Sequence, residues 1–382
     1  METRKIIFLL TTLSSGGGER VASDLTLSLP ENIDKTIVLF KKEISYPYKG
    51  KIVSLDISAY GNAFKKAINC FLGLVKFRKL IKEGKPDYVI SFGHLPNIIN
   101  IFSGVKSIVR VDNFYSSSCQ GFGGKIYKIL VKLLFNRAYI IMPVSKESGS
   151  DLIKNFGIKE DKIKVIYNPL NIEEIDRLSK SPLSEAHEDI FKNPVIINIG
   201  QLGKQKNQKD IIEAFKIIKE KIKKAKLVIL GQGPKEKDLR NLAEKLGLEK
   251  DIYFLGWQKN PFKFLANSKV FILSSLWEGL PCVLLEAMAS GLPVISYDCK
   301  SGPREILAPE TDSGFQAKNI EYAEYGVLTE PKNINQLAEV AVKLLSDKKM
   351  YLEYKENPRK RARHFNVENI IKEWDFLYET SN

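Results

Sequence analysis

The sequence has few cysteines and no long apolar run. Its 382 residues include four cysteines, at positions Cys70, Cys119, Cys282 and Cys299. Because they are widely separated and form no C-x-x-C pair, they indicate a reducing compartment rather than a disulfide framework or a zinc site. No uncharged apolar run is long enough to span a bilayer, so no membrane span is expected.

The N-terminal segment METRKIIFLLTTLSSGGGER has the charged start and apolar run of a signal peptide. The run is short, however, and no Ala-x-Ala cleavage site closes it. We interpret the segment as a first β-strand that leads into a glycine turn, and we expect a cytoplasmic protein.

The charge is positive and uneven. The formal net charge is +14, and residues 1–170 carry +12 of it. A pI of about 9.3 can indicate nucleic-acid binding, but the sequence lacks zinc knuckles, aromatic-basic interleaving and a helix-turn-helix pattern. We therefore expect the first half to meet an anionic partner other than nucleic acid.

Strand-like and helix-like runs alternate along the chain, which is typical of parallel sheets covered by helices. Strand candidates in the first half are KIIFLLTTL, KTIVLF, KIVSLDI, DYVISF, SIVRV, YIIMPVS and KIKVIYN. A polar, proline-containing stretch at 176–194 interrupts the pattern, which restarts at PVIINIGQL. The predicted fold class is α/β, with two Rossmann-like doubly wound domains facing across a ligand-binding cleft.

The predicted boundaries follow from that interruption. They are an N-terminal domain over 1–169, a linker region over 170–193, a C-terminal domain over 194–360, and a C-terminal helix over 361–382 that packs back toward the first domain.

Two glutamates, Glu278 and Glu286, lie in the stretch WEGLPCVLLEAMASG. The strand KVFILSS precedes it, and Pro281 suits the first turn of a helix, whose N–H groups and dipole favour phosphate. Carboxylates do not bind phosphate but accept hydrogen bonds from hydroxyl groups. A nucleotide sugar, with a central diphosphate and hydroxyls on either side, meets both requirements. The alternative is that the two acids only start and solvate a helix.

The stretch EGLPCVLLEAMASGLPVISYDCKSGPREIL resembles the signature region of the large retaining glycosyltransferase family of the two-Rossmann-domain (GT-B) type, group 1 or family 4-like. Glu278 and Glu286 match its E-x7-E motif. The strings GGGER, IKVIYNPLN and IGQLGKQKN resemble further blocks of that family in the right order, so the resemblance spans most of the chain. SGPREI is most similar to the branch that acts on lipid-linked oligosaccharides.

The resemblance implies transfer, with retention, of a hexose or N-acetylhexosamine from a UDP-sugar to a lipid-linked or oligosaccharide acceptor in cell-surface glycan synthesis. It implies that Glu278 binds a donor-sugar hydroxyl, Glu286 the ribose, and Lys206 a phosphate. The Asp-x-Asp pair that often holds a metal against a diphosphate is absent, so no metal cofactor is expected.

Two departures from the family concern charge and acid-base chemistry. The family usually has arginine where this chain has Gln201, and we expect Lys204 or Arg304 to supply the charge. The predicted donor-binding residues are Gly16, Gly17, Gly18, Gln201, Lys204, Lys206, Gly279, Leu280, Pro281, Cys282, Val283, Glu286 and Arg304.

Many relatives have a histidine after the strand equivalent to SIVRV, where this chain has Asp112 and Asn113. His94, at the end of an earlier strand, is the nearest histidine, and a loop histidine without a role is the alternative. The predicted catalytic set is Glu278, Lys206, His94, Asp112 and Asn113.

Two basic, amphipathic segments at 64–83 and 124–138 suggest attachment to the inner face of an anionic membrane. The predicted surface consists of Lys65, Lys66, Lys76, Arg78, Lys79, Lys125, Lys128 and Lys132. The alternative is that the apolar faces pack on the sheet and the lysines are only solvated. Phe71, Phe77 and Phe135 are predicted to be core residues.

Other functions remain open at this stage. A nucleotide-sugar epimerase or an inactive sugar-binding scaffold would have a similar fold, and a nucleic-acid-binding protein is the alternative from another class.

Overall fold

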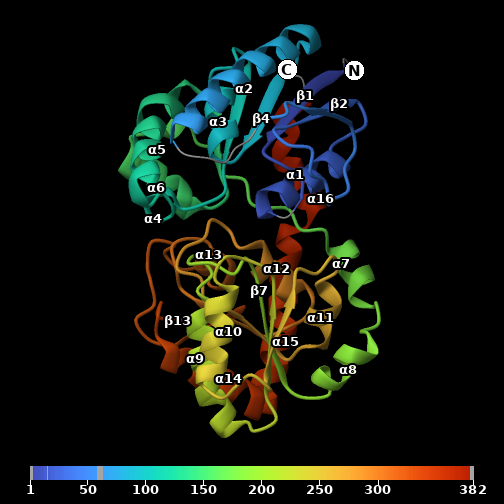
Figure 1. Ribbon diagram of the computed structural model, residues 1–382, viewed down its shortest axis with the longest axis vertical. Coiled ribbons are helices and arrows are strands. Elements are labelled where there is room, and N and C mark those ends of the chain that lie inside the picture. Colours follow the sequence, from blue (N-terminus) through green and yellow to red (C-terminus); the bar gives the residue numbers. More distant parts are fainter. Residues whose placement is uncertain (1–2, 15, 58–62, 379–382) are drawn as a thin grey trace. The chain divides into compact units, whose positions relative to one another are not determined.

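The computed structural model describes residues 3–14, 16–57 and 63–378, and only the backbone of residues 63–67. The chain forms two compact units. The first comprises Met1–Pro169 and Val367–Asn382, and the second Leu170–Asn366. Each unit is a largely parallel sheet covered by helices (Figure 1), which confirms the predicted α/β class.

The first unit is built on a six-stranded parallel sheet. Its strands are β1 (Arg4–Leu10), β2 (Ile33–Leu39), β3 (Lys51–Ser54), β4 (Tyr88–Phe92), β5 (Lys106–Val111) and β6 (Ile140–Pro143). Their order is β3-β2-β1-β4-β5-β6. The order reverses between β1 and β4, and the carboxyl ends of strands at such a switch point are where doubly wound sheets bind ligands.

Helices cover both faces of this sheet. They are α1 (Gly17–Ser28), α2 (Ala63–Gly84), α3 (His94–Ile101), α4 (Tyr115–Ser118), α5 (Gly121–Leu134) and α6 (Lys146–Phe156), with 3-10 turns at Phe135–Arg137 and Glu160–Lys162. One buried cluster joins β1, β2 and β4 to α2. A second joins β5 and β6 to α5 and α6.

The strand predicted at KIKVIYN is wrong. The segment runs beside the edge strand β6, and the N–H groups of Lys164 and Ile166 donate to Ile141 and Pro143. Only Ile163 forms a bridge, to Ile141. Because Pro143 has no N–H to donate in return, the ladder cannot continue along the end of β6.

The second unit has a seven-stranded sheet with the order β12-β13-β11-β10-β7-β8-β9. Its strands are β7 (Val195–Ile199), β8 (Lys226–Leu230), β9 (Ile252–Gly256), β10 (Val270–Leu273), β11 (Val294–Tyr297), β12 (Glu321–Ala323) and β13 (Gly326–Thr329). The short edge strand β12, which pairs antiparallel with β13, was not predicted. All other pairs are parallel.

The helices of the second unit are α7 (Ile172–Ser179), α8 (Glu185–Phe191), α9 (Gln208–Lys221), α10 (Glu236–Lys245), α11 (Phe262–Asn267), α12 (Cys282–Ala289), α13 (Pro303–Leu307), α14 (Ile334–Ser346) and α15 (Lys348–Ala362). The main core lies between the sheet and helices α9, α10 and α14. Residues 170–193, which we interpreted as a linker region, contain the helices α7 and α8. Helix α7 packs on α11 and α12.

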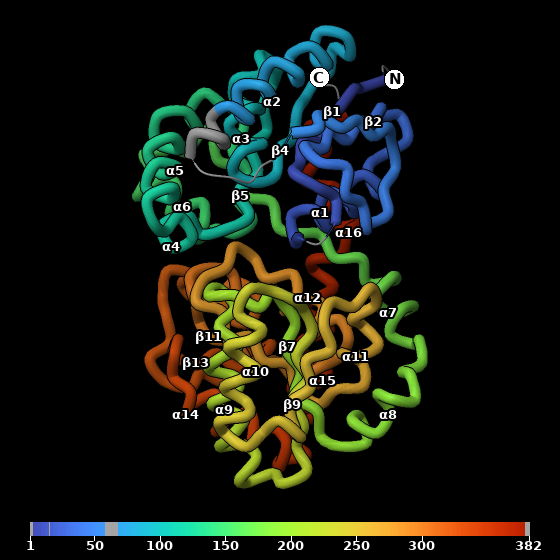
Figure 2. Tube along the Cα trace, viewed as in Figure 1, coloured from blue at the N-terminus to red at the C-terminus, as the bar shows by residue number. Residues whose placement is uncertain are grey.

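The C-terminal segment is not one helix over 361–382. After α15 the chain forms a 3-10 turn (Arg363–Phe365), α16 (Val367–Ile370) and a second 3-10 segment (Ile371–Leu377). From Val367 on, it belongs to the first unit. Figure 2 shows this red segment beside α1, and α16 contacts α1. The first unit is therefore completed by residues from the far end of the chain.

Candidate active site

The two glutamates of the E-x7-E motif lie on either side of one helix start. Strand β10 ends at Leu273, a loop contains Glu278, and α12 begins at Cys282 with Pro281 as its N-cap. Both carboxylate residues are buried, Glu278 at 5% exposure and Glu286 at 4%. The first turn of α12 therefore carries the N–H groups and the positive dipole end expected to favour an anion.

Lys206 and Glu278 form a close ion pair. The Lys206 Nζ lies 2.6 Å from the Glu278 Oε1, and their side chains are 18% and 7% exposed. Gln205 supports the same loop, since its Nε2 donates to the Trp277 carbonyl at 2.9 Å. Gly200 leaves room for the lysine stem, whose atoms lie 3.1–3.2 Å from where a Cβ would be. A cation and a carboxylate thus meet beside the start of α12.

The backbone around Glu278 is held by the loop that precedes α13. The Glu278 N–H donates to the Lys300 carbonyl at 2.8 Å, and the Ser301 hydroxyl donates to the Gly279 carbonyl at 2.9 Å. Gly302 has φ +97, and a Cβ there would lie 2.6 Å from the Gly279 oxygen. The SGPREI and EGLP strings are therefore two halves of one packed loop pair.

The other predicted residues of this region differ in exposure. Gln201 and Lys204 are exposed, and the Gln201 carbonyl accepts a hydrogen bond from the Gln208 amide at 3.2 Å. Gly279, Leu280 and Pro281 are buried, while Cys282 and Val283 are half-buried. The donor-binding role of each stays a prediction.

Arg304 lies in a buried ionic cluster. Its Nη2 is 2.6 Å from Asp298 and 2.7 Å from Glu321, its Nη1 donates to Thr311, and its guanidinium lies over the Phe315 ring. Burial raises the pKa of Asp298, and the hydrogen bond from Arg304 opposes that rise. These contacts give Arg304 a structural role, whereas its expected compensation for Gln201 stays a prediction.

In the first unit, the glycine turn and Asp112 come together. Gly16 caps α1, and the Glu19 carboxylate accepts hydrogen bonds from the Gly16 N–H and the Thr12 hydroxyl. A Cβ on Gly18 would lie 3.1 Å from the Asp112 Oδ2. Glycine at this position therefore lets the carboxylate at the end of β5 approach the start of α1.

A buried arginine orients that carboxylate. The Arg110 Nε lies 3.1 Å from the Asp112 Oδ1, and the Arg110 side chain is fully buried. Its Nη2 donates to Asn168 at 2.5 Å, and the rings of Phe92 and Trp374 lie near the guanidinium. Burial raises the pKa of Asp112, while the Arg110 charge opposes the rise.

His94 lies at the carboxyl end of β4 and begins α3 after Gly93, which has φ +93. Its ring stacks on Tyr127 with centroids 4.0 Å apart, and Tyr115 meets it edge-on at 5.5 Å. Strands β4 and β5 are neighbours, so His94, Asp112 and Asn113 all follow the carboxyl ends of adjacent strands. Their catalytic roles stay predictions.

Comparison with known proteins assigns the family. Residues 182–361 match the family described as glycosyl transferases group 1, and residues 15–174 match glycosyltransferase family 4. An uncharacterised glycosyltransferase of Methanocaldococcus jannaschii is 38% identical over 333 residues, which cover 80% of this chain and 82% of the relative. The chain belongs to the group 1 glycosyltransferases.

Two further likenesses cover nearly the whole glycosyltransferase. The N-acetylgalactosamine-N,N'-diacetylbacillosaminyl-diphospho-undecaprenol 4-alpha-N-acetylgalactosaminyltransferase of Campylobacter jejuni is 30% identical over 380 residues, 97% of this chain and 98% of the relative. The crystal structure of Anabaena HepE in complex with UDP and glucose has a TM-score of 0.79 at 18% identity, covering 98% of both chains. These matches support the GT-B fold of the glycosyltransferase.

Several side chains of the predicted basic surface of the glycosyltransferase form hydrogen bonds within the first unit. Lys76 donates to the Leu55 carbonyl at 2.6 Å, and Arg78 donates to the Phe102 carbonyl at 2.9 Å. Lys128 donates to the Ser116 carbonyl. Among the side chains that the structure describes, the exposed ones without such a bond are Lys79, Lys125 and Lys132. The side chains of Lys65 and Lys66 lie outside the described residues.

Three predictions placed aromatic residues of the glycosyltransferase in its core. Phe77 and Phe135 are fully buried, as predicted, but Phe71 is 66% exposed and its assignment to the core is wrong.

Across residues 3–14, 16–57 and 63–378, no helix has the length and apolar character to cross a membrane. Within the same ranges, no group of three or more His, Cys, Asp or Glu side chains is arranged to hold a metal ion.

Sequence reasoning missed two residues of the glycosyltransferase that orient others. Gln205 supports the Glu278 loop, and Arg110 holds Asp112. Arg110 has a sequence signal, because a charge inside the otherwise apolar strand SIVRV must be paired if it is buried. Gln205 has none, since polar residues are ordinary in a loop.

Proposed function

We propose that this glycosyltransferase moves a hexose or an N-acetylhexosamine from a UDP-sugar to a lipid-linked sugar acceptor, with retention and without a metal ion. The Campylobacter relative is named for an acceptor carried on diphospho-undecaprenol. The work would take place at the cytoplasmic face of a membrane, where the first unit meets an anionic surface.

The Lys206–Glu278 pair beside α12 is the observation that carries this proposal. Its two partners lie 2.6 Å apart and are largely buried. A UDP-sugar offers a diphosphate to the cation and to the start of α12, and sugar hydroxyls to the carboxylate. Glu286, buried within α12, would accept from the ribose hydroxyls. Lys206, the loop that contains Glu278, and α12 would thus together supply groups for each part of the donor.

The transfer exchanges one bond for another. The bond from the anomeric carbon to the donor phosphate oxygen breaks, and the acceptor hydroxyl oxygen bonds to that carbon. The acceptor proton passes to the departing phosphate oxygen, so UDP leaves with it. Lys206 and the α12 N–H groups would stabilise the charge that develops on the diphosphate, which is electrostatic preorganisation.

In the first unit, Asp112, Asn113 and His94 would serve the acceptor. Asp112 is held in place by Arg110, and its raised pKa suits a group that exchanges a proton or a hydrogen bond with a hydroxyl.

The proposal is tested by incubating the enzyme with UDP-, GDP- and TDP-sugars and a membrane lipid extract, with and without EDTA. Mass spectrometry should show one sugar added to a lipid-linked acceptor from a UDP-sugar, equally in both conditions, and NMR should show a retained anomeric configuration. Absence of product with every donor would refute the function. Product that forms only without EDTA would refute the metal-free mechanism.

A further inference from the structure

The connection from α13 to β12, residues 308–320, is fixed at the carboxyl edge of the second unit's sheet. Asp298 directly follows strand β11. Its carboxylate accepts the Ala317 N–H at 2.6 Å, and its carbonyl accepts the Gln316 side-chain amide at 2.7 Å. Connections of about a dozen residues without secondary structure are uncommon and usually serve a function. This one is held in place at the end of a central strand.

Arg304 holds the same connection from its buried side. This arginine is 3% exposed, and its guanidinium donates to Asp298 at 2.6 Å and to Glu321 at 2.7 Å. It also donates to the Thr311 hydroxyl at 2.9 Å. A buried ion cluster adds little stability by itself, because its charges lose their hydration. We therefore attribute the cluster to fixing the course of the connection.

Phe315 lies within this connection. The Arg304 guanidinium lies over its ring, 4.9 Å from the centroid, and such a cation–π contact orients the ring. Phe315 is nevertheless 52% exposed, so the side of the ring away from Arg304 is open to solvent. A single exposed apolar residue is ordinary. An exposed ring that is oriented by a buried charge, in a connection that is fixed, has the rigidity that a binding surface requires.

Lys300 links this ring to the candidate active site. The Lys300 carbonyl accepts the Glu278 N–H at 2.8 Å, and its Nζ donates to the Gly314 carbonyl at 2.6 Å. One residue thus joins the loop that contains Glu278 to the residue before Phe315. Phe315 is separated from that loop by a single lysine side chain, and all of these residues belong to the second unit.

A carboxylate adjoins the ring. The Phe315 N–H donates to the Asp312 carbonyl at 3.0 Å, so the two residues form one tight turn, and Asp312 is exposed. Carboxylates accept hydrogen bonds from hydroxyl groups, whereas the negative face of an aromatic ring attracts C–H groups with partial positive charge. A pyranose has hydroxyls at its edge and C–H groups on its face. Phe315 and Asp312 together match both parts of such a sugar ring.

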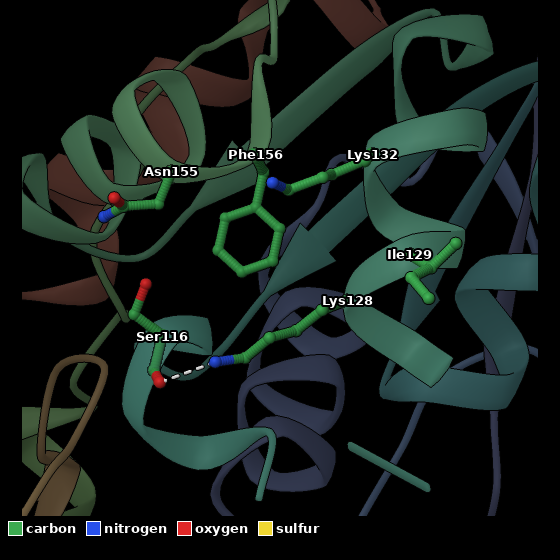
Figure 3. A pocket seen from close by; sticks show the side chains of 6 residues that line it. All are labelled: Ser116, Lys128, Ile129, Lys132, Asn155 and Phe156. Carbon is green, nitrogen blue, oxygen red and sulfur yellow. Dashed lines mark hydrogen bonds between the residues drawn. The ribbon is translucent and has the colours of Figure 1, made fainter. Parts of the chain in front are cut away.

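The first unit offers another place for a sugar. A pocket of about 260 Å³ is lined by Ser116, Lys128, Ile129, Lys132, Asn155 and Phe156 (Figure 3). Phe156 is 3% exposed, so its ring is not presented as a surface. The two lysines suit an anion better than an uncharged ring. Phe315 therefore fits an uncharged sugar better, and the pocket is the comparison site in the test.

We propose that Phe315 is a stacking platform for a pyranose ring of a sugar substrate, and that Asp312 accepts a hydrogen bond from a hydroxyl of the same ring. Both the UDP-sugar and the acceptor carry such a ring, and the test separates the two sources. The inference rests on the proposed function, because that function supplies the sugars. It adds a specificity-determining residue outside the E-x7-E motif.

The test measures sugar binding by the full-length enzyme without transfer. Calorimetry compares UDP with UDP-glucose, UDP-N-acetylglucosamine and UDP-N-acetylgalactosamine, which isolates the contribution of the donor sugar. Saturation-transfer difference NMR on the UDP-bound enzyme measures binding of methyl α-glucoside and methyl α-N-acetylgalactosaminide, which represent the end of the acceptor.

The variants are Phe315→Ser, Phe315→Leu and Phe315→Trp, with Asn155→Ala for the pocket of the first unit. Leucine is apolar but has no aromatic face, so it separates stacking on a sugar from packing on Arg304. The matched control is Tyr322→Ser, because Tyr322 is 43% exposed and the Lys343 Nζ lies over its ring at 4.5 Å.

Phe315→Ser and Phe315→Leu should weaken binding of the sugar by about tenfold, as for other lost aromatic stacking contacts. Phe315→Trp, Asn155→Ala and Tyr322→Ser should bind like the native enzyme. UDP alone should bind equally to all variants and raise their melting temperatures equally, which shows that they are folded. A loss confined to the UDP-sugars identifies the stacked ring as the donor's, and a loss confined to the methyl glycosides identifies it as the acceptor's.

Equal binding of every sugar by the native enzyme and Phe315→Ser would overturn the proposal. So would native-like binding by Phe315→Leu, since packing on Arg304 would then suffice. A loss in Asn155→Ala but not in Phe315→Ser would place the sugar in the pocket of the first unit instead. Sugars that bind through Phe315 without any transfer contradict only the proposed function, and native kcat/KM for transfer in Phe315→Ser contradicts only this inference.

Discussion

At the residue scale, the most consequential feature is the dependence of Lys206 and Glu278 on each other. Each is largely buried and contacts the other at 2.6 Å. Removing one member of such a pair leaves the other charge uncompensated. A donor that binds here must therefore replace part of this pairing with its own phosphate and hydroxyl groups. Glu286 lies farther along α12 and is outside that pair, so the two glutamates can be separated by experiment.

Substitution should distinguish the two acids. Glu286→Ala should weaken UDP and UDP-sugar alike, by about 1–3 kcal/mol, the loss expected for a hydrogen-bond partner that carries charge. Glu278 is proposed to contact only the transferred sugar, so Glu278→Gln should leave UDP binding unchanged. Because the substitution keeps the volume but removes the charge, turnover should fall at least tenfold, or about 1.4 kcal/mol. Calorimetric titration with UDP and steady-state kinetics measure the two effects.

The matched control is Glu244→Gln, an exposed acid on α10, which should change neither quantity. If both site variants lowered only the melting temperature and left kcat/KM unchanged, the acids would be helix-capping residues. The E-x7-E motif would then have no role in the donor site.

At the scale of elements, two loops that pack on each other hold the candidate site. The loop before α13 packs on the loop before α12 through Ser301 and Gly302. The positive φ of Gly302 and its closeness to the Gly279 oxygen leave no room for a side chain. The geometry of Glu278 therefore depends on Gly302, which lies 24 positions farther along the sequence.

Gly302→Ala should strain this contact. The expected loss of stability is about 1–3 kcal/mol, the range for a non-glycine residue held in a disfavoured backbone conformation, and UDP binding should weaken because the EGLP loop shifts. Urea unfolding and UDP titration measure the two effects. Gly123→Ala is the control, since an added Cβ there would have no atom within 4 Å. Native-like UDP binding in Gly302→Ala would show that the loop pair does not position the site.

The strands also show where the local sequence pattern is enough to predict pairing in a sheet. SIVRV is a strand as predicted, because neighbours on both sides satisfy its backbone. KIKVIYN has a similar composition but lies beyond an edge strand that ends in proline, so it forms one bridge only. The helix expected near Pro281 begins one residue later, with the proline as N-cap. Periodicity identifies the element, whereas the neighbour decides whether it pairs.

At the scale of the whole molecule, the chain ends in the unit in which it began. Trp374 is fully buried and lies 5.9 Å from the Arg110 guanidinium, and Lys164 lies over the Phe376 ring at 4.0 Å. The first unit is thus closed by residues that follow the entire second unit in sequence. Its stability should depend on the C-terminal segment.

Trp374→Ala should destabilise the first unit by about 3–5 kcal/mol, as for other large buried aromatic residues. Limited proteolysis with mass spectrometry should then show cuts in residues 3–169 before cuts in 170–366, while UDP still raises the melting temperature of the second unit. Trp257→Ala is the control, because Trp257 is 44% exposed. Equal proteolysis of both units would contradict this assignment.

The sequence alone determined the α/β class, most strands, the placement of the two E-x7-E glutamates around a helix start and the basic character of the first half, because these depend on local periodicity, motif spacing and summed charge. Only the tertiary structure decided which partner each group has. It paired Lys206 with Glu278, placed Trp374 beside Arg110, tied Arg304 to two acids, and left the outer faces of α2 and α5 uncovered. Burial and pairing depend on residues distant in sequence, so an apolar stripe has the same sequence pattern whether a sheet or a lipid covers it.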